Sequence, residues 1–86
     1  MASYRVLLKR SAVKELEVLP LTDRRRIAGK IQRLERDPRP PGVEKLSGQD
    51  RYRLRQGDYR VLYSIQDAST TVTIVKIGHR REVCRR

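Results

Sequence analysis

The sequence predicts a two-layer α+β fold, in which two helices cover one face of an antiparallel sheet in the order β-α-α-β-β-β. Residues 12–36 carry apolar side chains at helical spacing, whereas residues 51–77 alternate with the two-residue period of strands. The chain has only 86 residues, which indicates a single domain over 1–86 with a small core. Two helices then leave the second face of the sheet uncovered, so we expect that face to be open for binding.

The first elements are expected to be a short strand and a short helix. Residues 4–9, YRVLLK, are typical of a strand. Ser11 is a suitable N-cap for a helix over residues 12–19, which carries apolar side chains three or four positions apart. Pro20 then interrupts the helical pattern.

A second helix is expected to follow, capped by Thr22 or Asp23 and running to about Arg36. One side of it is apolar and its other faces are basic. Residues 37–42, DPRPPG, contain three prolines and a glycine and are expected to form an ordered bend. They do not link two domains, because about 40 residues on either side are too few for two cores.

Three strands joined by hairpins are expected in the second half of the chain, over residues 52–56, 59–66 and 70–77. Many of their apolar residues are β-branched, which a sheet favours. The expected core combines residues of both helices and all three of these strands. It consists of Leu16, Ile27, Ile31, Leu34, Leu54, Val61 and Ile74.

The net charge of +11 makes polyanions the expected partners: nucleic acid, a membrane surface or an acidic protein. No apolar run approaches the ~20 residues that span a bilayer, and the apolar stretch at the start of the chain, MASYRVLLKR, is too short for a signal peptide, so we expect a cytoplasmic protein. Cys84 is the single cysteine, which fits a reducing compartment. Without a Cys/His cluster, neither a metal nor another cofactor is expected.

Arginines recur on the predicted strands at positions that share a face. If Leu54 points at the helices, Arg53 and Arg55 point at the open face. Arg60 can join them from the next strand, and Arg80 follows the exit of the last strand. A cluster of guanidiniums matches phosphate in charge and in bidentate geometry. An ordinary solvated sheet face would also carry such charges.

The stretches KLSGQDRYRLRQGDYRVLYSI and TVTIVKIGHRREVCRR resemble the RelE-type toxins of the RelE/ParE superfamily, and YRVLLKRSAVKELEVLP fits their first strand and helix. The resemblance covers nearly the whole chain. It implies that the first strand pairs beside the last. It also implies a toxin of a type II toxin–antitoxin system that enters the ribosomal A site and cleaves mRNA there by metal-independent attack of the 2′-OH.

The resemblance also implies roles for particular residues. The two basic residues on the second strand of RelE-type toxins match Arg53 and Arg55, and the arginine that starts the third strand matches Arg60. The arginine after the last strand matches Arg80. The family's tyrosine, which stacks on a base and takes part in proton transfer, is replaced by Cys84, which cannot stack like a phenol. A weakened catalyst is therefore one expectation.

Two residues are candidates for the general base. His79 is the only histidine and the only group whose ordinary pKa lies near neutrality, although a surface histidine that holds the tail fits it as well. Glu44 lies near a glutamate that some ribosome-dependent relatives use. A solvated loop charge is the alternative, and the stronger one, for Glu44.

The expected partners are an acidic antitoxin, which forms a hetero-oligomer with the toxin, and mRNA on the ribosome together with ribosomal RNA; no membrane is expected. A ParE-like, non-catalytic inhibitor of DNA gyrase is the main alternative function. A catalytically weakened toxin that is still held by its antitoxin is another. A plain RNA-binding domain is less favoured, because no aromatic platform for base stacking is visible.

Overall fold

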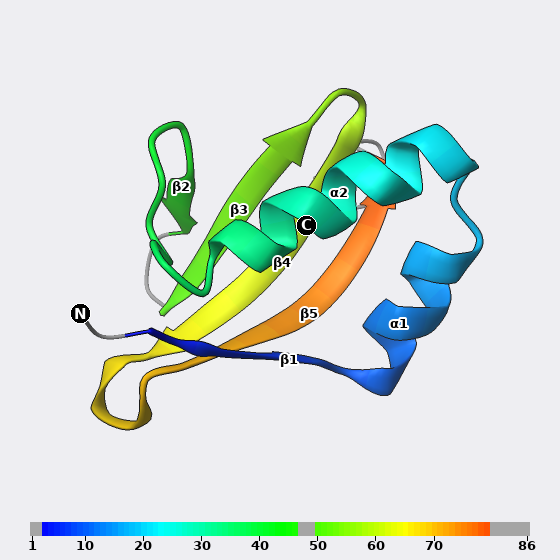
Figure 1. The fold of residues 1–86 in the computed structure, drawn as a ribbon. Coiled ribbons are helices and arrows are strands. Elements are labelled where there is room, and N and C mark those ends of the chain that lie inside the picture. Colours follow the sequence, from blue (N-terminus) through cyan, green and yellow to red (C-terminus); the bar gives the residue numbers. More distant parts are fainter. Residues whose placement is uncertain (1–2, 47–49, 80–86) are drawn as a thin grey trace.

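The computed structural model describes residues 3–46 and 50–79, and it has the predicted α+β architecture (Figure 1). In this part of the chain two helices follow the first strand, and the remaining strands come after them. The elements in order are β1 Arg5–Leu8, α1 Arg10–Glu17, α2 Leu21–Arg33, β2 Glu44–Leu46, β3 Arg51–Gln56, β4 Tyr59–Gln66, a 3-10 turn Asp67–Ser69 and β5 Thr71–His79.

The described strands form one mixed sheet in the order β1-β5-β4-β3-β2. The pairs β2–β3, β3–β4 and β4–β5 are antiparallel, whereas β1 runs parallel to β5. The first strand therefore lies beside the last, as expected, but the expectation of a fully antiparallel sheet is wrong at β1. A parallel pair needs a long connection, and nearly the whole chain lies between these two strands.

Both helices begin earlier than the sequence pattern indicated. Lys9 is the N-cap of α1 in place of Ser11, and Pro20 is the N-cap of α2 in place of Thr22 or Asp23. Neither cap residue makes a side-chain hydrogen bond to its helix. Helix α2 also ends three residues before the expected boundary at 36. Packing of the apolar faces against the sheet therefore sets these helices more than capping does.

The core lies between the sheet and the two helices, and α2 crosses the front of the sheet in Figure 1. Ile27 and Ile31 of α2 are buried in the same core cluster as Val61 of the central strand β4. Of the seven expected core residues six are buried, and Leu16 is half-buried while it packs against the same cluster. No helix in the described part of the chain is long and apolar enough to cross a membrane.

A β-bulge changes the alternation of β5. Adjacent residues of β4 pair with Ile74 and Lys76, which leaves Val75 between them as the extra residue. Ile74 and Ile77 are both buried in the core although they are three positions apart. Residues of β5 after Val75 consequently lie on the opposite face from the one that strict alternation predicts.

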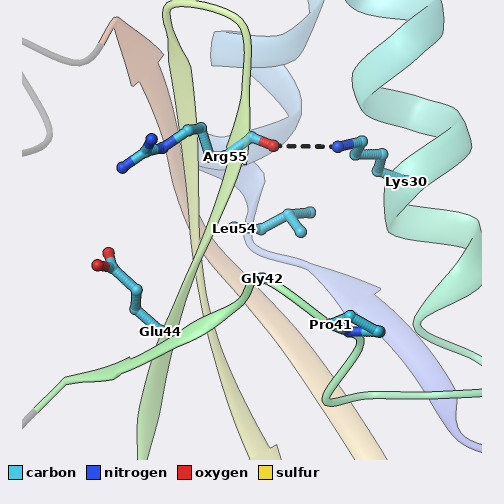
Figure 2. Close-up of a pocket in the computed structure, with 6 residues that line it drawn as sticks. All are labelled: Lys30, Pro41, Gly42, Glu44, Leu54 and Arg55. Atoms are coloured by element: carbon cyan, nitrogen blue, oxygen red, sulfur yellow. Dashed lines mark hydrogen bonds between the residues drawn. The ribbon is translucent and has the colours of Figure 1, made fainter.

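A charged side chain from each helix binds the backbone of a strand where its shorter outer neighbour ends, α1 at β5 and α2 at β3. Where β1 no longer covers β5, the backbone N–H of Ile77 donates to Glu15 Oε1 at 2.8 Å, and Lys76 Nζ lies 3.4 Å from Glu15 Oε2. Where β2 does not cover β3, Lys30 Nζ donates to the backbone oxygen of Arg55 at 3.1 Å (Figure 2). These bonds satisfy backbone groups that would otherwise lack a partner strand.

The proline-rich bend is fastened to the sheet by a buried tyrosine. The Tyr63 hydroxyl donates to the backbone oxygen of Pro38 at 2.8 Å, and its ring stacks on Tyr52 at a centroid distance of 5.7 Å. Tyr63 is fully buried, and burial raises the pKa of its hydroxyl above the ordinary value. The segment 37–42 is thus an ordered bend in the described structure, as the sequence predicted.

A salt bridge holds the same bend to the turn before β5. Arg39 Nη2 lies 2.8 Å from Asp67 Oδ2, and Arg39 Nε donates to the Tyr52 hydroxyl at 3.0 Å. The Tyr4 hydroxyl donates to Asp67 Oδ1 at 2.7 Å. The hydrogen bonds from Arg39 and then from Tyr4 are the main causes that lower the pKa of the Asp67 carboxyl.

The variant Tyr63→Phe should destabilise the fold, because it leaves the buried oxygen of Pro38 without its donor. An unsatisfied buried polar group costs about 1–3 kcal/mol, which thermal unfolding will register as a lower midpoint. Tyr59→Phe is the matched control, since the Tyr59 hydroxyl makes no hydrogen bond within the described residues. Equal midpoints for the two variants would contradict this role of Tyr63.

The Asp67 ion pair should make stability depend on pH. Because the folded-state pKa of Asp67 is lowered, the unfolded chain binds the proton at a higher pH than the folded chain. The stabilisation is complete above the ordinary carboxyl range and is lost as pH falls through the lowered pKa. We therefore expect Asp67→Asn to lower the unfolding midpoint near neutral pH, by an amount that shrinks as pH falls through the lowered pKa of Asp67. The control variant is Asp50→Asn, which removes an exposed carboxylate elsewhere in the chain.

Candidate functional site

The arginines of β3 lie on the sheet face that the helices leave uncovered. Leu54 is buried at 6% exposure and points toward α2, whereas the Arg55 side chain points the other way (Figure 2). Arg53 has the same parity as Arg55, and Arg60 of β4 is the direct register partner of Arg55. Residues that are paired across two strands share a face. The structure thus brings Arg53, Arg55 and Arg60 together.

A carboxylate already lies among these guanidiniums. Glu44 of β2 is the cross-strand partner of Arg53, and its Oε1 accepts from Arg53 Nε at 2.9 Å and from Arg53 Nη2 at 2.7 Å. This hydrogen bonding is the main cause that lowers the pKa of Glu44, and the charges of Arg53, Arg55 and Arg60 add to it. The site therefore favours an anion, and Glu44 is a weaker base than an ordinary glutamate.

Arg60 is held firmly at the turn between β3 and β4. It is only 8% exposed, and its Nη1 donates to the backbone oxygens of Gly57 at 3.2 Å and Tyr59 at 3.0 Å. Its partner on β5 is Gly78, which has no side chain and so leaves room for the arginine against the sheet. Arg60 is consequently preorganised, whereas Arg55 is exposed.

His79 does not share the face of the arginines. It pairs in register with Tyr59, and the two rings meet edge-on with centroids 5.9 Å apart. Arg60 and Gly78, the next pair along the strands, lie on the opposite face. The bulge at Val75 causes this placement, because it reverses the parity of the residues that follow it.

Two expected site residues, Arg80 and Cys84, lie outside the described residues. The sequence analysis missed β2, the strand that brings Glu44 beside Arg53. Residues 44–46, EKL, show no two-residue alternation, so the local sequence carried no strand signal here. Within residues 3–46 and 50–79, no group of three His, Cys, Asp or Glu side chains is placed to hold a metal ion.

Known proteins share both the sequence pattern and the fold. A family model described as the ParE toxin of the type II toxin–antitoxin system parDE matches residues 6–84. Toxin RelG of Mycobacterium tuberculosis is 50% identical over 32 residues, a segment that covers 37% of this chain and 37% of that toxin.

Solved toxin–antitoxin complexes match over most of the chain. The archaeal RelE–RelB complex of Pyrococcus horikoshii OT3 has 38% identity and a TM-score of 0.84, covering 91% of this chain and 96% of that one. RelBE2 of Mycobacterium tuberculosis has 29% identity and a TM-score of 0.80, with coverages of 92% and 100%. The Escherichia coli RelBE complex has 29% identity and a TM-score of 0.77, with coverages of 90% and 96%. With a family match over residues 6–84, this chain belongs to the RelE/ParE superfamily of type II toxin–antitoxin toxins.

Proposed function

We propose that this toxin is a ribosome-dependent endoribonuclease that cleaves mRNA in the ribosomal A site, and hence acts in the cytoplasm. The observation that carries the proposal is that Arg53, Arg55 and Arg60 share the sheet face away from the helices, where the charges of all three act on Glu44. The likeness to solved RelE toxins, with up to 38% identity among those named above, supports the same reaction. Primer extension on mRNA from cells that express the chain tests it, because A-site cuts appear as new 5′ ends.

The proposed reaction is an internal transfer at phosphorus. The 2′-oxygen forms a bond to the adjacent phosphorus while the bond to the 5′-oxygen breaks, and a proton passes from the 2′-OH to a base as the leaving oxygen receives one. Negative charge grows on the phosphoryl oxygens in the transition state. Arg53, Arg55 and Arg60 remain protonated at neutral pH and would stabilise that charge. The phosphate would take the place that the Glu44 carboxylate now has beside Arg53.

Proton transfer requires a base for the 2′-OH and an acid for the leaving oxygen. The position of His79 against Tyr59 supports a role in holding the end of β5, in place of the catalytic role considered above. The lowered pKa of Glu44 disfavours it as a base while it binds Arg53. We propose that Arg80 completes the charge stabilisation and that Cys84 stands where relatives have the tyrosine.

Inhibition of DNA gyrase is the second candidate function. The matching family model is that of a ParE toxin, which favours it. A ParE-like toxin would need the basic face only for binding, so its action would not require the arginines to surround a phosphate. Induced cells separate the two functions: mRNA ends at A-site positions mark cleavage, and DNA damage without such ends marks gyrase inhibition.

An acidic antitoxin is the proposed protein partner. The relatives described above were solved as complexes with RelB antitoxins, and the net charge of +11 favours carboxylates on this toxin. A segment that folds as it binds would cover both the basic sheet face and exposed apolar residues such as Val18 and Leu21. We propose that the two proteins form a hetero-oligomer whose association is fast and salt-sensitive.

Arg55→Ala should lower ribosome-dependent cleavage about 100-fold, equivalent to ~3 kcal/mol of transition-state stabilisation. Arg55 is exposed and its side chain makes no hydrogen bond within the described residues, so the unfolding midpoint should stay unchanged. Arg5→Ala on β1 is the matched control, because it removes the same charge from the same sheet face at the other side. Cleavage by Arg55→Ala at the parental rate would place the active site elsewhere. Arg60→Ala is less suitable, since Arg60 also fastens the β3–β4 turn.

Cys84→Tyr should raise cleavage, because a ring restores stacking on a base, worth roughly 1–3 kcal/mol. Cys84→Ser separates two accounts of the cysteine. It should change the rate little if the thiol only leaves the tyrosine's place vacant, and it should inactivate the toxin if the thiol transfers a proton. We expect the first result, measured as the rate of mRNA cleavage on isolated ribosomes. If the parent toxin, which has Cys84, cleaves mRNA faster than the Cys84→Tyr variant, the stacking account is wrong.

A further inference from the structure

Helix α2 presents a second basic surface, which we name the arginine stripe: Arg25, Arg26, Gly29, Arg33 and Arg36. These residues are exposed. Arg25 and Arg26 lie four and three positions before Gly29, Arg33 lies four positions after it, and Arg36 follows the end of α2 by three positions, so they follow one side of α2 and the turn after it. Within residues 3–46 and 50–79, their four guanidiniums make no ion pair and no side-chain hydrogen bond. The stripe is therefore not used to hold this fold together.

The arginine stripe lies on the opposite side of the molecule from the site on the sheet. Helix α2 rests on the sheet through the buried Ile27 and Ile31, and the stripe is on its far side. Lys30 reaches the backbone of Arg55 from the α2 side, whereas the Arg55 side chain points away from α2 (Figure 2). Whatever binds the stripe does not compete directly with a phosphate held by Arg55.

Gly29 lies in the middle of the stripe, and folding does not account for it. A glycine within a helix is less stable than an alanine. A Cβ at Gly29 would meet no atom of the described chain within 4 Å, so packing inside the molecule does not require glycine here. A missing side chain on an exposed helix lets another molecule approach the helix closely.

Two shallow hollows meet at Gly29. One has a volume of about 220 Å³ and the other about 500 Å³. Both also include Arg33, so the hollows join along the stripe. Glu35, at the border of the larger hollow, is the acidic residue that lines them. The first is lined by Arg25, Arg26, Gly29, Lys30, Arg33 and Gln56, and the second by Gly29, Gln32, Arg33, Glu35 and Arg36.

We propose that the arginine stripe binds the phosphate backbone of a second RNA segment, separate from the one that is cleaved. The backbone positions from Arg25 to Arg33 span about 12 Å along the helix, and Arg36 lies beyond them, so the stripe suits a row of phosphates. The stripe holds no apolar side chain, and a protein helix or strand would need such anchors to dock. It also holds no aromatic ring, so binding is independent of base sequence. The choice of RNA over another polyanion rests on the proposed function.

Fluorescence anisotropy of a labelled 20-base-pair RNA duplex, titrated with the whole purified chain at several salt concentrations, tests the stripe. The double variant Arg25→Gln, Arg33→Gln should reduce the slope of log affinity against log salt by about 2, one for each lost phosphate contact. Arg10→Gln, Lys14→Gln is the control, because it removes the same charge from exposed positions on α1. Equal slopes for the two double variants would overturn the proposal.

The variant Gly29→Leu tests the stripe in a protein that should be more stable than the parent, so weaker RNA binding cannot result from unfolding. The substitution should raise the unfolding midpoint by about 4–8 °C, because leucine favours a helix, while it lowers RNA affinity by filling the hollows. A stabilised variant that binds RNA like the parent would overturn the proposal. So would polyglutamate that displaces the duplex as well as unlabelled RNA does, since the stripe would then suit an acidic protein. These binding measurements need no cleavage, so they stand even if the toxin does not cut mRNA.

Discussion

In the described part of the chain, both helices lie on the same face of the sheet, and this one-sided packing governs the rest of the structure. Both helices lie against that face, so every second residue of β3 and β4 must be apolar and its neighbours must point away. The burial of Leu54 therefore turns Arg53 and Arg55 outward, and Arg60 follows because it pairs with Arg55. A slip of one residue in β3 would bury two arginines, so the fold itself fixes the place of the candidate site.

The alternation in RYRLRQGDYRVLYSI was enough to predict both strands and the face on which Arg53, Arg55 and Arg60 meet. It succeeded because β3 and β4 are joined by a tight turn at Gly57, which has φ +60°, and continue in register from it. The helical core residues were predictable for a similar reason, because the apolar side of a helix must be buried against the sheet. In these segments local pattern and long-range packing require the same arrangement.

Other features depend on contacts that no local pattern contains. Strand β2 is a strand only because β3 pairs with it, which is what brings Glu44 to Arg53. The bulge at Val75 depends on the pairing with β4, and it moves His79 to the face of Tyr59. Lys9 and Pro20 are the N-caps although neither side chain caps its helix, so no local capping motif marked where the helices begin. Sequence proximity of His79 to the arginines at 80 and 81 therefore did not predict whether it shares a face with Arg53, Arg55 and Arg60.

The charged side chains at the two sheet edges have a consequence for copies of this protein that meet one another. An uncovered strand edge is a template on which another chain can add a strand, and repeated addition leads to aggregation. At β5, where β1 no longer covers it, the backbone N–H of Ile77 donates to Glu15. At β3 the carbonyl of Arg55 accepts from Lys30. A strand arriving at either place would have to break that bond and bury a charge. The fold thereby protects itself from polymerisation at the points where its short outer strands leave the longer ones exposed.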